Sequence, residues 1–178
     1  WEGNGRCNLG LLYQEQGRGA DARVQFDIAL TTAREVGFVR LAYTVLCNLG
    51  ILLAAEGRLA EAAEHLQEAV KGAIANADRR SEGQFRGSLA LALAKQGRID
   101  EAHESLDRGE ALLIASADRL SHALLLCDRA EIELMDSRTE AAGAALKNAQ
   151  RIADELDCRP ESELRRRLGA ISAALLVS

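Results

Sequence analysis

Residues 48–58 read NLGILLAAEGR, and the same pattern occurs three more times at intervals of 40 residues. It appears as NLGLLYQEQGR at 8–18, as SLALALAKQGR at 88–98 and as DRAEIELMDSR at 128–138. A period of about 20–50 residues is typical of a solenoid, in which each unit buries its apolar face only by stacking on its neighbours. The repeat therefore predicts an elongated domain with a surface suited to binding.

Each unit is expected to contain two amphipathic helices. Leu9, Leu12 and Tyr13 recur at helical spacing and predict a first helix whose apolar face turns toward the second. Ala22 and Phe26 begin the apolar face of that second helix. The Gly-Arg turn between them ends the first helix, because glycine adopts the left-handed conformation at little cost. Alternation with a period of two is absent, so we expect no strands.

The predicted fold is an all-α, right-handed superhelical solenoid of four helical hairpins with a C-terminal capping helix. We place the repeats at 1–37, 38–77, 78–117 and 118–157, and the capping helix within 158–178. First helices are expected near 1–16, 39–56, 79–96 and 119–136, second helices near 19–36, 59–76, 99–116 and 139–156, and the closing helix near 161–177. Pro160 is expected near its first turn, and Arg165, Arg166 and Arg167 are expected on its solvated outer face.

At the repeated positions the chain resembles the tetratricopeptide repeat family. Matches in the first unit are Leu9-Gly10, Tyr13, Ala22, Phe26 and Ala29, and in the second Leu49-Gly50, Leu53, Ala62, Leu66 and Ala69. The third unit is a fair match, with Leu89-Ala90, Leu93, Ala102, Leu106 and Gly109. In the fourth unit Arg129 and Glu133 replace apolar residues of the first helix.

The chain also departs from that family's pattern. The family's early Trp is missing, its closing Pro appears only as Pro160, and the unit of 40 residues is longer than the usual length of about 34. The resemblance is therefore to the long-helix variety, found in kinesin light chains, cell-polarity adaptors and bacterial regulators with a helical sensor region. It implies a protein- or peptide-binding role.

Composition argues against several other classes. The net charge is −5 and only six residues are aromatic, whereas single-strand nucleic-acid binding needs a basic groove with stacking platforms. No run of 18 apolar residues occurs, so no membrane span is expected. The sequence contains no Gly-rich phosphate loop, nucleophile elbow or kinase signature. We therefore expect no catalytic residues, no cofactor and no interaction with nucleic acid or membrane.

Cysteines and histidines do not form a metal-binding pattern. Cys7, Cys47 and Cys127 share one repeat position, with Gly87 at the equivalent place in unit three. Equivalent positions in neighbouring repeats lie about 10 Å apart, the spacing of packed helices, which is too far for a disulfide. Small packing residues are therefore the expected role of these cysteines, and Cys158 lies outside the pattern. No His pair has the i, i+4 spacing of a zinc site, so no metal site is expected.

A partner is expected in the concave groove, which the first helices line in the resembled family. The predicted groove residues are Asn8, Leu11, Asn48, Ile51, Ser88, Leu91, Lys95, Asp128 and Glu131. In the family, Asn at the position of Asn8 and Asn48 commonly holds the backbone of a peptide, since an amide both donates and accepts hydrogen bonds. Alternatively, the Asn-Leu-Gly motif persists by repeat duplication alone.

The charge along the groove guides the choice of ligand. The family's clamp for a C-terminal carboxylate is not expected, because its positions hold Cys7, Leu11, Gln84 and Ser88, and only Asn48 fits. The groove ends in Asp128 and Glu131, which favours an amphipathic or mildly basic peptide or helix over an acidic tail.

Three functions remain open. The first is a non-catalytic protein- or peptide-binding scaffold, the C-terminal adaptor or sensor region of a larger bacterial regulatory protein in the cytoplasm. The alternatives are a small-molecule-sensing domain of a transcriptional regulator or signalling ATPase, and a structural oligomerisation spacer. The chain begins at Trp1-Glu-Gly, which indicates a fragment, and Arg far outnumbers Lys, which is typical of a GC-rich bacterium.

Trp1, Leu9 and Leu12 are expected to form an N-terminal edge that is frayed or covered by a second copy in a homodimer.

Overall fold

The computed structural model describes residues 2–177, and this part of the chain contains nine α-helices and no strand. The helices are α1 (Glu2–Glu15), α2 (Gly19–Glu35), α3 (Val39–Ala55), α4 (Leu59–Ala75), α5 (Arg79–Lys95), α6 (Ile99–Ala115), α7 (Arg119–Met135), α8 (Thr139–Glu155) and α9 (Glu163–Leu175). The expected helix boundaries agree within two residues. The all-α helical solenoid is confirmed.

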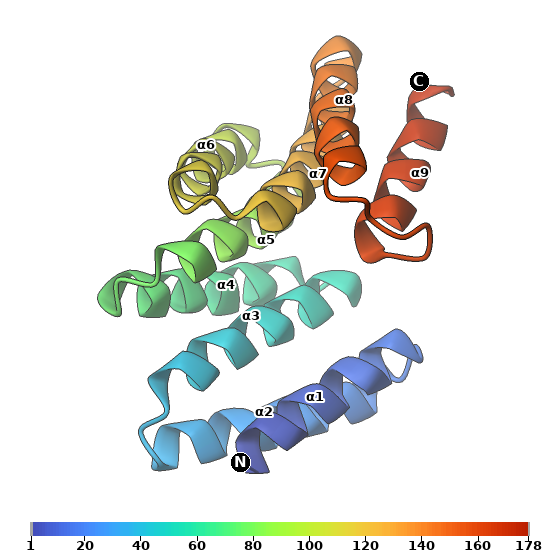
Figure 1. Cartoon of the computed structure of the whole chain (residues 1–178). Coiled ribbons are helices and arrows are strands. Elements are labelled where there is room, and N and C mark those ends of the chain that lie inside the picture. The colour runs from blue at the N-terminus through green and yellow to red at the C-terminus, as the bar shows by residue number, and fades with distance from the viewer. Residues whose placement is uncertain (1, 178) are drawn as a thin grey trace.

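The helices form four hairpins that stack in chain order (Figure 1). Each odd-numbered helix from α3 to α7 packs against its own hairpin partner and against the second helix of the preceding hairpin. The odd-numbered helices also contact one another in series, so they form one continuous layer. The last helix, α9, packs on both α7 and α8 and closes the C-terminal end of the stack.

Turns with a positive φ angle recur every 20 residues, twice as often as the sequence pattern indicates. Glycine occupies four of them (Gly17, Gly37, Gly57 and Gly97), and Ala77, Ala117, Ser137 and Asp157 occupy the others. In each turn the next residue donates its backbone N–H to the carbonyl five residues earlier, as Arg58 does to Leu53 at 2.9 Å. This bond satisfies a carbonyl that the helix end leaves free. The expected turn positions Gly17, Gly57, Gly97 and Ser137 are confirmed.

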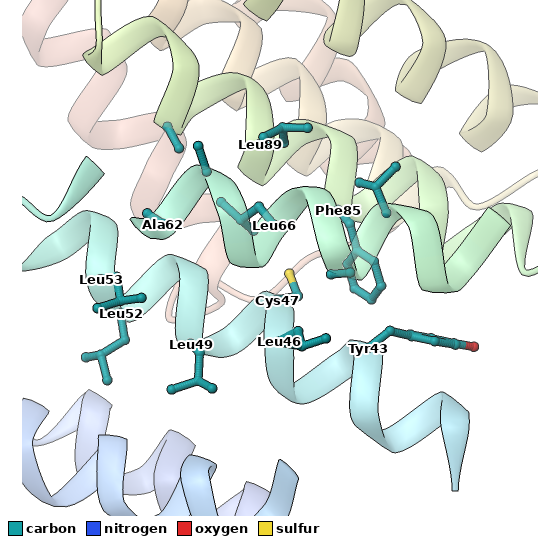
Figure 2. Close-up of a cluster of buried hydrophobic side chains, with 14 of the residues drawn as sticks. Tyr43, Leu46, Cys47, Leu49, Leu52, Leu53, Ala62, Leu66, Phe85 and Leu89 are labelled. Carbon is teal, nitrogen blue, oxygen red and sulfur yellow. The ribbon is translucent and has the colours of Figure 1, made fainter. Parts of the chain in front are cut away.

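Small residues in the repeat let the two helices of a hairpin approach closely. A Cβ atom on Gly50 would lie 2.5 Å from Cγ of Leu66, and one on Gly10 would lie 2.5 Å from the ring of Phe26. Phe26, Ala62 and Leu66 are completely buried as a result. Figure 2 shows buried side chains of this core on α3, α4 and α5, among them Leu53, Leu66 and Phe85. The Leu-Gly motif therefore reflects close packing.

One predicted contact of the first hairpin is wrong. Leu12 was expected to face α2, but its side chain is 48 % exposed. Its equivalent in the next repeat, Leu52, is 4 % exposed because it packs across the repeat boundary, near Gly19 of α2. This position therefore faces the preceding repeat and not its own hairpin partner. Trp1, which we assigned to the same edge, lies outside the described residues.

Ion pairs replace apolar contacts in the fourth repeat. Glu133 is buried, and its carboxylate lies 2.7 Å from Nε of Arg138, the residue that precedes α8. Arg129 binds Asp107 and Glu110 of α6 at 2.7 and 2.9 Å. The buried core accordingly falls into two clusters, one mainly in the first three repeats and one formed by α7, α8 and α9. The charged residues that replace apolar ones in this hairpin therefore have partners of opposite charge.

Candidate functional site

A cavity of about 610 Å³ lies along the layer of odd-numbered helices, between α3, α5, α7 and α9. We call it the groove. Seven of the predicted site residues line it, namely Asn48, Ile51, Ser88, Leu91, Lys95, Asp128 and Glu131. Asn8 and Leu11 do not, because they lie exposed on α1 beyond the end of the cavity. The groove is therefore built from repeats two to four and the closing helix.

Several lining residues were not expected from the sequence. Thr44, Gln84, Ser121 and Leu124 come from the first half of α3, α5 and α7, and Glu163 and Arg167 come from α9. Thr44, Gln84 and Leu124 occupy one repeat position, 40 residues apart, so a wider projection of the helical wheel would have included them, whereas Ser121 lies outside that series. The contribution of α9 follows from its packing against α7.

Polar side chains of the groove bond to the cysteine of the preceding repeat. Nδ2 of Asn48 lies 3.4 Å from Sγ of Cys7, and Ser88 hydrogen-bonds the thiol of Cys47. Burial raises the pKa of both thiols, that of Cys47 to about 12. The cysteines are therefore protonated packing groups, and all four in the chain are free thiols. Asn48 retains its carbonyl oxygen and one amide hydrogen for a ligand.

Arg167 pairs with both carboxylates at the acidic end of the groove and offsets part of their charge. One of its terminal nitrogens lies 2.7 Å from Oδ1 of Asp128 and 2.6 Å from Oε1 of Glu131. Burial raises the pKa of Asp128 to about 6, with Arg167 acting in the opposite direction and Glu131 and Glu163 adding to the rise. The two neighbouring carboxylates raise the pKa of the Arg167 guanidinium, although burial opposes this. The acidic end that was expected to attract a basic peptide already holds a cation.

The expected solvated face of the closing helix is only partly correct. Arg166 is exposed, but Arg165 binds Asp154 at 2.8 Å and Arg167 points into the groove. Arg167 follows Asp128 by 39 residues, whereas the strict 40-residue register would pair Asp128 with Leu168. The repeat pattern therefore does not identify Arg167 as a groove residue.

Two charged side chains in the groove lining make no ion pair with other described residues. These are Lys95, which is exposed at the end of α5, and Glu163 in the first turn of α9. The middle of the lining is apolar and includes Ile51, Leu91 and Leu124. The groove therefore offers apolar contacts, polar groups from Asn48 and Ser88, and one free charge of each sign.

The three histidines lie outside the groove; His103 and His122 pair with nearby carboxylates, and Nδ1 of His65 lies 2.9 Å from the backbone carbonyl oxygen of Glu61. Nε2 of His122 lies 3.0 Å from Glu110, and Nδ1 of His103 lies 3.7 Å from Glu133. Within residues 2–177 no group of three His, Cys, Asp or Glu side chains has the geometry of a metal site. None of the helices in this range is both long and apolar enough to cross a membrane.

Family models of the tetratricopeptide repeat match residues 3–75 and 83–108. A search of curated proteins finds no match to the sequence. Among solved structures, BtubC (BKLC) from P. vanneervenii superposes with a TM-score of 0.71 at 18 % identity, covering 93 % of this chain and 70 % of its own. A kinesin light chain-type protein of Podosopora anserina, with nearly identical TPR-like repeats, gives a TM-score of 0.70 at 18 % identity, covering 98 % and 84 %.

Proposed function

Because the chain belongs to the tetratricopeptide repeat family, we propose that it is a non-catalytic scaffold that binds a protein or peptide segment in the groove. The family generally mediates protein–protein interaction. The observation that carries the proposal is the cavity of about 610 Å³, which is lined by seven of the residues selected from the repeat pattern.

The lining favours a ligand with apolar side chains and an accessible backbone. Ile51 and Leu91 supply apolar contacts, and Asn48 keeps a donor and an acceptor that fit peptide groups. Because Arg167 pairs with the carboxylates at the acidic end, the side chains of Lys95 and Glu163 are the groups that select charged residues of the ligand. We therefore propose an amphipathic segment, and a basic group on it would reach Asp128 and Glu131 only by displacing Arg167.

Selection of peptides from a phage-displayed random library tests the proposal. Peptides selected on the wild-type chain should lose at least tenfold in affinity for Ile51→Glu, which places a charge in the apolar part of the groove. Ile114→Glu is the matched control, because Ile114 is an exposed isoleucine on α6 outside the groove. Equal affinity for the two variants, or a failure to select any peptide, would contradict groove binding.

A small-molecule sensor is the second candidate, and the size of the cavity favours it. Ligand pockets for small molecules measure about 300–1,000 Å³, and the groove, at about 610 Å³ with a wall formed by α9, falls within that range. Thermal-shift screening of a metabolite panel tests this function. A hit whose stabilisation disappears in Ile51→Glu but persists in Ile114→Glu would favour the sensor.

We further propose that the chain acts as the adaptor or sensor region of a larger bacterial regulator in the cytoplasm. Four free cysteines are typical of a reducing compartment.

An N-terminal edge that exposes Leu11 and Leu12, which are 40 % and 48 % exposed, supports a homodimer through this edge. The third possibility, an oligomerisation spacer, predicts self-association without any groove ligand.

A further inference from the structure

The closing helix α9 forms one end of the groove. It lies beside α7 and α8 (Figure 1), and its residues Glu163 and Arg167 are part of the cavity lining. Without α9, the groove would continue along the exposed side of α7. The position of this helix therefore sets the length of the surface that a ligand can occupy.

The attachment of α9 is lighter than that of the other late helices. Three of its side chains are buried, Leu164, Leu168 and Ile171, whereas α8 buries six residues and α7 nine. Residues 156–162 connect α8 to α9, a longer link than the three residues between α7 and α8. After α9, Leu176 and Val177 are 86 % and 87 % exposed. Elements with few buried contacts open first in native proteins.

Polar contacts hold α9 at two places. Arg165 binds Asp154 and the carbonyl of Cys158, and therefore secures the link to α8. Arg167 reaches the opposite side, where it binds Asp128, Glu131 and, at 3.5 Å, the carbonyl oxygen of Leu124. Asp154 is largely exposed, which makes the Arg165 pair weak. The contacts of Arg167 with a buried carboxylate are the stronger attachment.

From this geometry we infer that α9 is a movable end wall of the groove, held closed by Arg167, and that a ligand crossing α7 displaces Arg167 from Asp128 and Glu131. The role of a ligand rests on the proposed groove function, whereas opening of the wall does not. A cationic group on the ligand would replace Arg167 beside the buried carboxylate. Opening therefore regulates access to the fourth repeat.

Cys127 provides a native probe of this opening. It is completely buried in the cluster that includes Leu164, Leu168 and Ile171. Cys47 serves as an internal reference, because it is buried in α3 within the other cluster. Pulse labelling with N-ethylmaleimide, followed by digestion and mass spectrometry, measures the rate at each cysteine separately.

Arg167→Gln and the matched control Arg166→Gln test the inference. Both remove one positive charge from neighbouring positions of α9, but Arg166 is exposed and its side chain makes no ion pair with another residue in the range 2–177. Labelling of Cys127 should be at least tenfold faster in Arg167→Gln than in Arg166→Gln, with Cys47 unchanged. Arg167 lowers the pKa of Cys127, so its loss would by itself slow the reaction. Faster labelling therefore reports exposure.

Two results of this comparison, and a third from Arg167→Lys, would overturn the movable wall. One is equal labelling of Cys127 in the two variants, and the other is a parallel increase at Cys47, which would indicate general unfolding. Arg167→Lys is a variant in which α9 should be held with intermediate strength. Lysine keeps the positive charge but lacks the second terminal nitrogen of the guanidinium group. Its Cys127 rate should fall between the wild type and Arg167→Gln, and a rate no faster than wild type would also contradict the inference.

A binding experiment with the selected peptides distinguishes this inference from the proposed function. Peptides selected on the groove should bind Arg167→Gln more tightly than Arg166→Gln if they cross α7, by at least threefold. Faster labelling of Cys127 without any selected peptide would support the movable wall and contradict the peptide scaffold. Selected peptides combined with unchanged labelling would support the scaffold and contradict the wall.

Discussion

The carboxylate of Asp128 occupies the space that a side chain on Gly87 would need. A Cβ atom built on Gly87 would collide with Oδ2 of Asp128. The two residues continue a series across the repeats, in which Cys7 meets Asn48 and Cys47 meets Ser88. The change from cysteine to glycine in the third repeat thus accompanies the change from a neutral partner to a buried carboxylate. It explains the one gap in the cysteine pattern.

Gly87→Ala should destabilise the chain by about 1–3 kcal/mol, the range for overpacking a closed site. Asp128 cannot move freely, because Arg167 holds its carboxylate at 2.7 Å. Gly143→Ala in α8 is the control, since its added Cβ would meet no atom within 4 Å apart from its chain neighbours and the backbone of its own helix. That change should be neutral or stabilising by up to about 1 kcal/mol, because alanine favours a helix. Equal effects in urea titrations would contradict the close contact.

The titration of Asp128 should appear as a pH dependence of stability. Its pKa is raised to about 6 in the fold, from a value near 3.9 in an unfolded chain. The folded state therefore binds the proton more tightly, and the stabilisation is complete below about pH 4 and lost as the pH rises through 6. The unfolding free energy of the wild type relative to Asp128→Asn should fall between pH 4 and 7, by on the order of 2 kcal/mol.

The contributions of other carboxyl groups to the pH dependence of stability cancel when the wild type is compared with Asp128→Asn. Asp78 and Asp118 have lowered pKa values because they cap helices through Ser81 and Ser121, with burial opposing the shift. They titrate alike in the wild type and in Asp128→Asn. A difference that stays constant with pH would mean that the attraction of Arg167 balances burial at Asp128, and one that rises would mean that it outweighs burial.

Much of the architecture could be predicted from the sequence, because the repeat determines the helix ends and the register of the hairpins. Gly17, Gly57 and Gly97 marked the helix ends, and the 40-residue register placed residues such as Asn48 and Leu91 along one groove. The orientation of the closing helix was harder to predict. Its start at Glu163, after the link that contains Pro160, breaks the register, so periodicity does not determine which of its faces meets the groove. Arg167 was therefore assigned to the solvent although it lies in the site.

The sequence also could not show how repeats meet at their boundaries. Leu12 and Leu52 occupy the same repeat position, but one is exposed and the other buried. The difference depends on the neighbouring hairpin, which no property of the residue itself reports. The same holds for Glu133, a carboxylate that is buried beside Arg138 and His103.

Truncation of the large residues in the second helices should be strongly destabilising. Leu66 and Leu106 are completely buried in the main core cluster. Replacing either by alanine should cost about 2–5 kcal/mol, since cavities in closed cores collapse only partly. Glu64→Ala, on the exposed side of α4, should cost under about 0.5 kcal/mol. Comparable small losses at all three positions in a denaturant titration would show that the buried faces are misassigned.

A pair of equivalent leucines tests the N-terminal edge. Leu52→Ala should cost about 2–5 kcal/mol because Leu52 is buried between α3 and the preceding repeat. Leu12→Ala should cost less than about 1 kcal/mol in a monomer, since about half of its side chain is already in water. If a second copy covers α1, Leu12→Ala should instead shift the sedimentation of the chain toward monomer and lower its melting temperature in a concentration-dependent way. A small, concentration-independent loss with a single monomeric species would rule out the homodimer through this edge.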